Sequence, residues 1–325
     1  MARLGKRVAG AVAVMAICGS VAAFAQQRDF PVAAAPVLDD RMPNPPVVFA
    51  NGVRAWRDVV YQTIAGYRPQ IIDIYVPPAP GPHPLILYIH GGGWVGGHTR
   101  HSGALANFPE VLAALAAEGF TVASLEYRLA AEAPFPAQLQ DVNASLRFLR
   151  GRAAEYRIDP ARVGVWGGSA GGHLSALAAV TCRDTALDPA STGDSCIQAA
   201  AIWYGVFDFA PMIASADGNP NRLLGCAAPC PAGKIGAVSP VTHIDRTDPP
   251  FLLIHGEQDK VVPAAQSRLG EAALRKAGIP VEAIYIPGVD HSFIGATPDA
   301  TRAATLKATN ATFDFFRAKL GKPAK

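Results

Sequence analysis

The chain has 325 residues, of which half are hydrophobic, and it carries 29 basic against 26 acidic side chains. This length suits one large α/β domain or two average domains, and so small a net charge excludes the strongly basic surface typical of nucleic-acid-binding proteins. Three basic residues lie within the first 25 positions, so the rest of the chain carries 26 of each sign. We therefore expect no nucleic-acid partner.

The N-terminal segment has the pattern of a secretory signal peptide. Arg3, Lys6 and Arg7 precede the apolar run Val8–Ala22, and Ala23-Phe-Ala25 matches an Ala-x-Ala cleavage site. We predict cleavage after Ala25 and export to the periplasm or the medium. An uncleaved membrane anchor is the alternative, which the small residues at the cleavage site disfavour. No later apolar run is long enough to span a bilayer, so no membrane attachment is expected after cleavage.

Four cysteines remain once Cys18 leaves with the signal, and they enter an oxidising compartment in which disulfides persist. Three pairings are possible. We favour the local pairs Cys182–Cys196 and Cys226–Cys230, because each closes a short loop rich in Gly, Pro, Asp or Ala. A zinc site is the rival, but no second short-spaced Cys or His pair accompanies Cys226 and Cys230.

The elements beyond the signal alternate between strands and helices. Residues 26–50 are rich in proline and lack periodicity, which predicts an N-terminal arm over 26–55. Apolar runs then predict strands at 71–76, 85–90, 120–125, 163–166, 199–203, 251–255 and 281–286. The helices are predicted at 105–117, 139–150, 171–180, 264–277 and 298–319.

The apolar pattern of these strands predicts the fold class. Runs such as Leu85–Ile89 are apolar without alternation, which is typical of parallel strands covered by helices on both faces. Ile71–Val76 does alternate, so the N-terminal strands are predicted to form an antiparallel edge. We therefore predict an α/β fold with a mostly parallel twisted central sheet and helices on both faces, as a single domain over 56–325. The Gly- and Pro-rich segment 207–250 is predicted to form a partial lid.

Ser169 stands in a Gly-x-Ser-x-Gly motif between a predicted strand and a predicted helix. This arrangement is typical of a nucleophile elbow, in which the turn is so tight that the flanking residues must lack bulk. Gly167, Gly168, Ala170 and Gly171 meet that requirement. A Gly-rich turn can also bind phosphate, but this one contains neither Gly-x-Gly-x-x-Gly nor a Walker Gly-Lys-Ser/Thr. We therefore interpret Ser169 as a nucleophile.

A serine nucleophile needs an imidazole to accept its proton and a carboxylate to orient that imidazole. Behind such an elbow the expected chain order is Ser, Asp or Glu, His. Asp259 and His291 fit this order, and each follows the carboxyl end of a predicted strand, where the active sites of such sheets gather. Their simpler interpretations are a turn or cap carboxylate and a surface histidine. The rivals are Asp208 and Glu257 among the carboxylates, and His173, expected inside the elbow helix, and His255, expected to pack at a strand end.

His90-Gly-Gly-Gly-Trp94 follows another predicted strand and matches the HGGG type of oxyanion loop. Attack on an ester carbonyl builds negative charge on oxygen, which preorganised N–H donors stabilise. We assign the N–H groups of Gly92 and Gly93 to this role, with that of Ala170 as a third donor. His90 is expected to order the glycine loop by hydrogen bonding.

No metal and no cofactor are predicted. A metal site would have to recruit three histidines near the glycine loop, His90, His98 and His101. Their spacing fits no common ligand motif. We therefore expect chemistry carried by side chains and backbone N–H groups alone.

Together these motifs resemble those of the α/β-hydrolases, specifically the secreted bacterial esterases of the feruloyl and acetyl-xylan esterase-like (BD-FAE-like) group, which is related to the hormone-sensitive lipase family. The resemblance covers most of the mature chain. It is carried by His90-Gly-Gly-Gly-Trp94, Glu126-Tyr-Arg-Leu129, Pro134-Phe-Pro136, Asp141, Gly167-Gly-Ser-Ala-Gly-Gly-His-Leu174, Ser239-Pro240, Pro249-Pro-Phe251 and His255-Gly-Glu-Gln-Asp259. One departure is Glu126, where relatives often have Asp before the Tyr-Arg pair.

The resemblance implies the α/β-hydrolase fold and a secreted serine carboxylic ester hydrolase that forms an acyl-enzyme. The expected substrates are short-chain or aryl acyl esters, either small molecules or groups linked to a polysaccharide. A narrower alternative is a plant polysaccharide deacylase that releases acetyl or feruloyl groups. An alternative of another class is a non-catalytic hydrolase-fold binding protein, which the presence of candidates for all three triad members disfavours.

Overall fold

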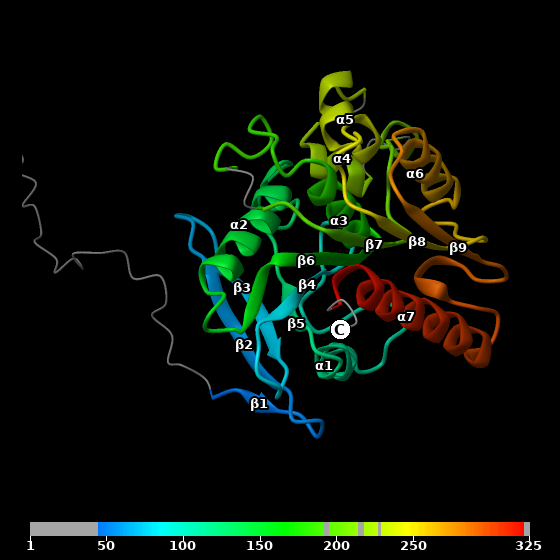
Figure 1. The fold of residues 1–325 in the computed structure, drawn as a ribbon. Helices are drawn as coiled ribbons and strands as arrows, with labels where there is room; N and C mark the ends of the chain where they lie inside the picture. Colours follow the sequence, from blue (N-terminus) through cyan, green and yellow to red (C-terminus); the bar gives the residue numbers. More distant parts are fainter. Residues whose placement is uncertain (1–44, 192–194, 214–217, 227–228, 322–325) are drawn as a thin grey trace, which may run out of the picture. The chain divides into compact units, whose positions relative to one another are not determined.

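One mixed sheet forms the centre of the part of the chain that the structure describes (Figure 1). The computed structural model describes residues 45–191, 195–213, 218–226 and 229–321. Nine strands pair within these residues, in the spatial order β1-β2-β3-β5-β4-β6-β7-β8-β9. Their bounds are β1 Val47–Val48, β2 Arg54–Gln62, β3 Gln70–Val76, β4 His83–Ile89, β5 Thr121–Leu125, β6 Ile158–Gly168, β7 Ala199–Trp203, β8 Phe251–Gly256 and β9 Val281–Ile286.

Strand directions confirm the predicted antiparallel edge and parallel body. β2 runs antiparallel to β1 and β3, and β3 runs antiparallel to β5. From β5 across to β9, every neighbouring pair is parallel. β1 and the first residues of β2 lie within the range 26–55 that was predicted for the arm. The boundary between the arm and the domain, at residue 55, stays a prediction. The predicted signal, residues 1–25, lies outside the described residues.

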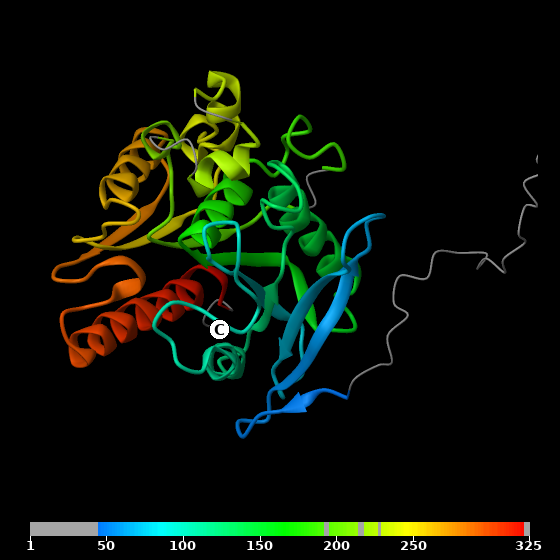
Figure 2. The same cartoon turned by 180° about the vertical axis from the view of Figure 1, so that it is seen from behind.

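Helices cover both faces of the sheet, as predicted (Figures 1 and 2). Helices α1 (Phe108–Ala117) and α7 (Pro298–Leu320) lie on one face, and α2 (Ala137–Gly151), α3 (Ala170–Val180) and α6 (Ala265–Lys276) lie on the other. Each face has its own cluster of buried side chains. Because both faces are covered, every residue of β4, β5, β7 and β8 is buried, which explains their uninterrupted apolar runs.

The segment 207–250 contains short helices. They are η1 (Ala210–Met212), α4 (Asn219–Leu224), α5 (Ala232–Val238) and η2 (Pro240–Thr242). Figure 1 shows α4 and α5 beyond α3, on the side away from α7. That this segment acts as a partial lid stays a prediction.

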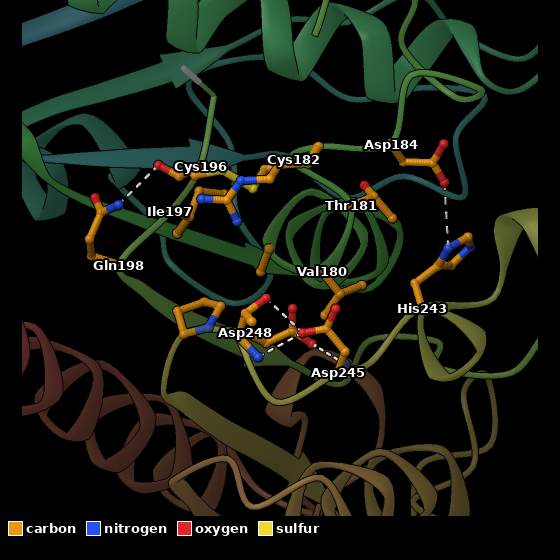
Figure 3. A pocket seen from close by; sticks show the side chains of 14 residues that line it. Val180, Thr181, Cys182, Asp184, Cys196, Ile197, Gln198, His243, Asp245 and Asp248 are labelled. Carbon is orange, nitrogen blue, oxygen red and sulfur yellow. Dashed lines mark hydrogen bonds and ion pairs between the residues drawn. A yellow bond between two sulfur atoms is a disulfide. The ribbon is translucent and has the colours of Figure 1, made fainter. Parts of the chain in front are cut away.

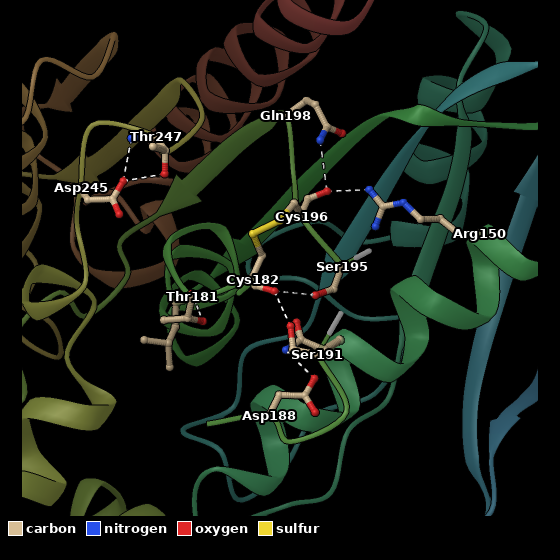
Figure 4. The surroundings of a disulfide bond; sticks show 12 residues. Arg150, Thr181, Cys182, Asp188, Ser191, Ser195, Cys196, Gln198, Asp245 and Thr247 are labelled. Carbon is tan, nitrogen blue, oxygen red and sulfur yellow. Dashed lines mark hydrogen bonds between the residues drawn. A yellow bond between two sulfur atoms is a disulfide. The ribbon is translucent and has the colours of Figure 1, made fainter. Parts of the chain in front are cut away.

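Two disulfides, Cys182–Cys196 and Cys226–Cys230, confirm the predicted local pairing. The first joins the segment after α3 to the segment before β7 (Figure 4). Its main chain is anchored on both sides, because Arg150 donates to the carbonyl oxygen of Cys196 and Ser191 donates to that of Cys182. This crosslink therefore ties the end of the elbow helix to the entry of a central strand.

The two disulfides are expected to contribute unequally to stability. Cys182 and Cys196 are 14 residues apart, whereas Cys226 and Cys230 are only 4 apart. Since a crosslink that closes a longer loop removes more entropy from the unfolded chain, C182S/C196S should lower the free energy of unfolding by about 3 kcal/mol. C226S/C230S should lower it by less. Urea denaturation of both double variants tests this order, and a larger loss from the second pair would contradict it.

Candidate active site

Ser169 sits at the junction of β6 and α3, in a backbone conformation that non-glycine residues rarely adopt. Its φ is 57° and its ψ −122°. The turn is tight because α3 begins directly against the end of β4: a Cβ at Gly171 would lie 2.0 Å from the carbonyl oxygen of Ile89. The N–H of Ser169 donates to Trp203 on the neighbouring strand β7 (3.0 Å). The strained bend thereby carries the serine hydroxyl out at the carboxyl end of the sheet.

The three side chains predicted as a triad lie in hydrogen-bond contact. His291 Nε2 is 3.0 Å from Ser169 Oγ, and His291 Nδ1 is 2.7 Å from Asp259 Oδ2. Asp259 lies in the loop after β8, and His291 begins η3 (His291–Phe293) after β9. Asp290 braces both loops, because its Oδ1 accepts from the N–H groups of His291 (2.7 Å) and Lys260 (2.9 Å).

Hydrogen bonds keep Asp259 ionised although it is 7% exposed. Burial would raise its pKa, but donation from His255, His291 and the N–H of Val262 outweighs burial and holds the pKa well below its ordinary value. Its Oδ1 accepts from the N–H groups of Val261 (2.9 Å) and Val262 (2.8 Å), which leaves Oδ2 facing His291. Since a carboxylate only accepts, His291 carries its hydrogen on Nδ1 and turns Nε2 towards the serine hydroxyl.

The rival carboxylates predicted from the sequence are engaged elsewhere. Asp208 Oδ1 accepts from the N–H of Ala210, and Glu257 pairs with Arg268. Neither makes a hydrogen bond to His291 among the contacts of the described residues. The structure therefore joins only Asp259, of the three candidates, to the imidazole.

The two rival histidines have different surroundings. His173 is buried in α3, where Nδ1 accepts from the indole N–H of Trp94 (3.2 Å) and Nε2 donates to Val238 O (2.7 Å). His255 is fully buried at the end of β8, as expected, but its Nε2 also lies 3.4 Å from Asp259 Oδ2. Sequence reasoning did not predict the contact between His255 and Asp259. The two residues are only four positions apart, across the end of β8 and its loop, and this spacing is the sequence feature that indicates it.

Tyr204 is a second residue that sequence reasoning missed. It follows β7 with a φ of 37°, a strained value for a side chain of this size. Its ring lies 4.8 Å from that of His291, in an edge-to-face arrangement. No sequence signal pointed to it, because the contact exists only where β7 and the loop after β9 meet in space.

The predicted oxyanion loop lies beside the serine. Gly92 has a φ of 113°, and a Cβ there would lie 2.2 Å from Gly96 O, so this position requires glycine. His90 makes the expected loop contact, with Nδ1 2.7 Å from Gly91 O. Among the hydrogen bonds of the described residues, none uses the N–H of Gly92 or Gly93. Ala170 is the first residue of α3, so its N–H points out of the helix start beside Ser169.

These residues open into a cavity of about 530 Å³. Glycines and polar side chains dominate its lining. The lining residues are Tyr88, Gly91, Gly92, Gly93, Gly96, Gly97, His101, Ser102, Gly103, Gly168, Ser169, Tyr204, Asn219, Val261, His291 and Ser292. Among the described residues of the segment 207–250, Asn219 alone contributes to it.

A second cavity, of about 560 Å³, lies next to the starts of β7 and β8, beside Cys182–Cys196 (Figure 3). Its polar groups include Asp184, whose Oδ2 is 3.8 Å from His243 Nδ1, and Asp248, whose pKa burial raises to about 6. Among its described lining residues there is no serine, and both cysteines are joined in the disulfide. No hydroxyl or thiol there is hydrogen-bonded to His243, so this cavity has no nucleophile paired with a base. In the part of the chain that the structure describes, no three His, Cys, Asp or Glu side chains gather as metal ligands would.

Buried histidines should make the protein less stable in mild acid. Burial lowers the pKa of both His90 and His173 to about 4. Since an unfolded histidine titrates near 6.5, the unfolded chain takes up these protons first, and stability is lost as the pH falls from about 6.5 to about 4. The loss should reach about 3 kcal/mol for each ring.

H173Q removes one of these groups, so its free energy of unfolding should depend less steeply on pH. Urea denaturation of wild type and H173Q at pH 7, 5.5 and 4 measures the difference. An unchanged pH slope in the variant would contradict a role for this ring.

The chain is similar to a family model and to proteins named as esterases. The BD-FAE family model matches residues 72–274. "Esterase LipQ" of Mycobacterium tuberculosis is 33% identical over 240 residues, which cover 70% of this chain and 55% of that protein. The chain spans about half the length of the curated relatives it matches.

Solved structures extend the match to the fold. A "truncated form of carbohydrate esterase from gut microbiota" is 29% identical with a TM-score of 0.69, covering 82% of this chain and 96% of that one. An "acetyl ester-xyloside bifunctional hydrolase" from Caldicellulosiruptor lactoaceticus is 25% identical with a TM-score of 0.65, covering 78% and 89%. The architecture is the α/β-hydrolase fold. On this match, which takes in the serine elbow and the loop of Asp259, the chain belongs to the BD-FAE family.

Proposed function

We propose that this protein is a serine carboxylic ester hydrolase. The observation that carries the proposal is the line of contacts from Asp259 through His291 to Ser169, at a strained elbow that faces a cavity. A serine hydroxyl in such contact with an oriented imidazole is an activated nucleophile. The glycine loop beside it supplies N–H donors for the oxyanion.

In the proposed reaction, Ser169 Oγ attacks the ester carbonyl carbon while its proton passes to His291 Nε2. Asp259 stabilises the resulting imidazolium without taking the proton. The N–H groups of Gly92, Gly93 and Ala170 stabilise the negative oxygen. Collapse breaks the bond to the alcohol, which leaves with the proton from His291. Water then repeats the sequence on the acyl-enzyme, releasing the acid and restoring the serine. No cofactor takes part.

The cavity lining favours short acyl groups. Val261 is the one aliphatic side chain among the described lining residues, so a long acyl chain would meet few aliphatic side chains at this cavity. We therefore expect initial rates on p-nitrophenyl esters to be highest for acetate to butyrate and to fall steeply by palmitate. Equal rates across the series would contradict this acyl preference, and no hydrolysis of any ester would contradict the proposed activity.

A second candidate is the removal of acyl groups from a plant polysaccharide. It is favoured by the likeness to proteins described as a carbohydrate esterase and an acetyl ester-xyloside hydrolase, and by the polar His101, Asn219 and Ser292 at the cavity. Release of acetate or ferulate from xylan by the purified protein tests it. Hydrolysis of p-nitrophenyl acetate without any release of acetate or ferulate from xylan would contradict this second candidate and leave the general ester hydrolase activity in place.

We also propose that the mature protein is secreted. The two disulfides are compatible with an oxidising compartment. Within the described ranges, no helix is both long and apolar enough to cross a bilayer. The first residue of the protein recovered from the periplasm or medium should be Gln26, which N-terminal sequencing determines.

A further inference from the structure

His255 is the second imidazole in contact with Asp259. It is fully buried in β8, four residues before the carboxylate. Its Nε2 lies 2.8 Å from the carbonyl oxygen of Val262 and 3.4 Å from Asp259 Oδ2. Its Nδ1 lies 2.7 Å from the hydroxyl of Ser267 on α6. Both ring nitrogens are therefore engaged in the protein interior.

The partners of His255 decide where its hydrogen sits. The carbonyl oxygen of Val262 can only accept, so Nε2 must carry the hydrogen. In the neutral ring Nδ1 is then an acceptor, and the Ser267 hydroxyl donates to it. The Nε2–H thus points at Val262 O and, at longer range, at Asp259 Oδ2.

That contact completes the set of donors around the Asp259 carboxylate. Two backbone N–H groups, of Val261 and Val262, donate to Oδ1. Neither of them bonds to Oδ2, so the position of Oδ2 depends on the side chains that donate to it. Oδ2 is the oxygen that meets His291 Nδ1 at 2.7 Å. A fixed Oδ2 directs the imidazole, because the carboxylate and the ring share one hydrogen bond.

We propose that His255 is a positioning residue: its Nε2–H holds Oδ2 of Asp259 where that oxygen orients His291. The inference rests on the proposed ester hydrolysis, because the orientation of His291 matters only if His291 takes the proton of Ser169. His255 itself is not among the described residues that line the cavity, and none of its hydrogen bonds reaches Ser169. It acts through Asp259.

Other groups that face this pair belong to neighbouring elements. The ring of Tyr204, after β7, lies 6.4 Å from that of His255 and 4.8 Å from that of His291. Ser267 faces His255 from α6, and the pair of Lys260 with Asp290 (3.2 Å) lies at the surface of the same loops. The two substitutions of His255 described next leave all of these groups in place.

Two substitutions of His255 separate positioning from packing. H255M keeps a side chain of similar length but has no N–H donor, whereas H255Q carries an amide N–H that can reach the position of Nε2. In H255M we expect kcat/KM for p-nitrophenyl acetate to fall about tenfold, mainly in kcat, as for the loss of one hydrogen bond to a charged group. The acid limb of its pH profile should move up by about half a pH unit, because Oδ2 then has His291 as its only side-chain donor. H255Q should recover most of both.

Matched variants keep the test decisive. H83M changes another buried histidine, at the start of the central strand β4, whose two ring nitrogens both face carbonyl oxygens. It should lower the melting temperature without moving the acid limb. S267A removes the hydroxyl that donates to Nδ1 of His255 and should move the limb in the same direction as H255M, by less. S267A carries the test if H255M does not fold.

A proton NMR readout is independent of turnover. The resonance of the hydrogen between His291 and Asp259 should move downfield in H255M and return in H255Q. If wild type hydrolyses esters but H255M matches it in kcat/KM, acid limb and resonance, or if H255Q is no better than H255M, positioning by His255 is refuted while the proposed function stands. If wild type hydrolyses no ester, the proposed function fails, and the resonance alone decides whether His255 holds the carboxylate.

Discussion

Ser169→Ala should lower kcat for p-nitrophenyl acetate by a factor of about a million. The variant loses the atom that forms the acyl-enzyme, and neither His291 nor the glycine loop can replace it. Removing Oγ leaves the elbow otherwise unchanged, because alanine fits wherever serine fits. Initial rates at saturating substrate, with the melting temperature measured alongside, would establish the loss.

Ser175→Ala is the matched control for this experiment. Ser175 is the same residue type on α3, the helix that begins directly after Ser169, and its hydroxyl is buried without a hydrogen-bond partner among the described residues. Its loss should leave kcat within about twofold. A fluorophosphonate probe should label wild type and Ser175→Ala but not Ser169→Ala. Equal turnover by Ser169→Ala and wild type would rule out a serine mechanism, and labelling of Ser169→Ala would place the nucleophile elsewhere.

Asp259→Asn should lower kcat by about ten thousandfold. An asparagine offers an N–H or a carbonyl where Oδ2 now accepts from His291, so the ring loses the partner that keeps its hydrogen on Nδ1. The imidazole then presents Nε2 to Ser169 in the wrong tautomer, and its protonated form loses a counter-charge. The fold should survive, because the backbone donors of Val261 and Val262 can still bond to the side-chain oxygen. Rates from pH 5 to pH 9 measure the effect.

The rival carboxylates supply the controls. Asp208→Asn and Glu257→Gln change groups that bond to Ala210 and Arg268 rather than to His291. Each should leave kcat within about threefold. A loss at either position as large as that of Asp259→Asn would show that Asp259 is not the orienting residue.

Most of the sheet could be predicted from the sequence, but not its edge. The buried parallel strands appear as continuous apolar runs because both of their faces are covered. β2 was not predicted, because it is half-buried and its pairing with β3 shifts register twice, which breaks any alternation. β6 begins at Ile158, five residues before the predicted start, since Asp159-Pro-Ala-Arg162 is polar yet still continues the strand.

The sequence by itself determined the candidate site, because each part of the site belongs to a short sequence motif. The elbow of Ser169 and the glycine loop need residues without bulk at adjacent positions, and Asp259 and His291 each follow the end of an apolar strand. Only the tertiary structure decided which groups support them. His255 and Tyr204 reach Asp259 and His291 because β7, β8 and β9 lie side by side and end at the same edge. Strand order is set by how the helices pack across the whole sheet, a non-local property that no short segment of sequence contains.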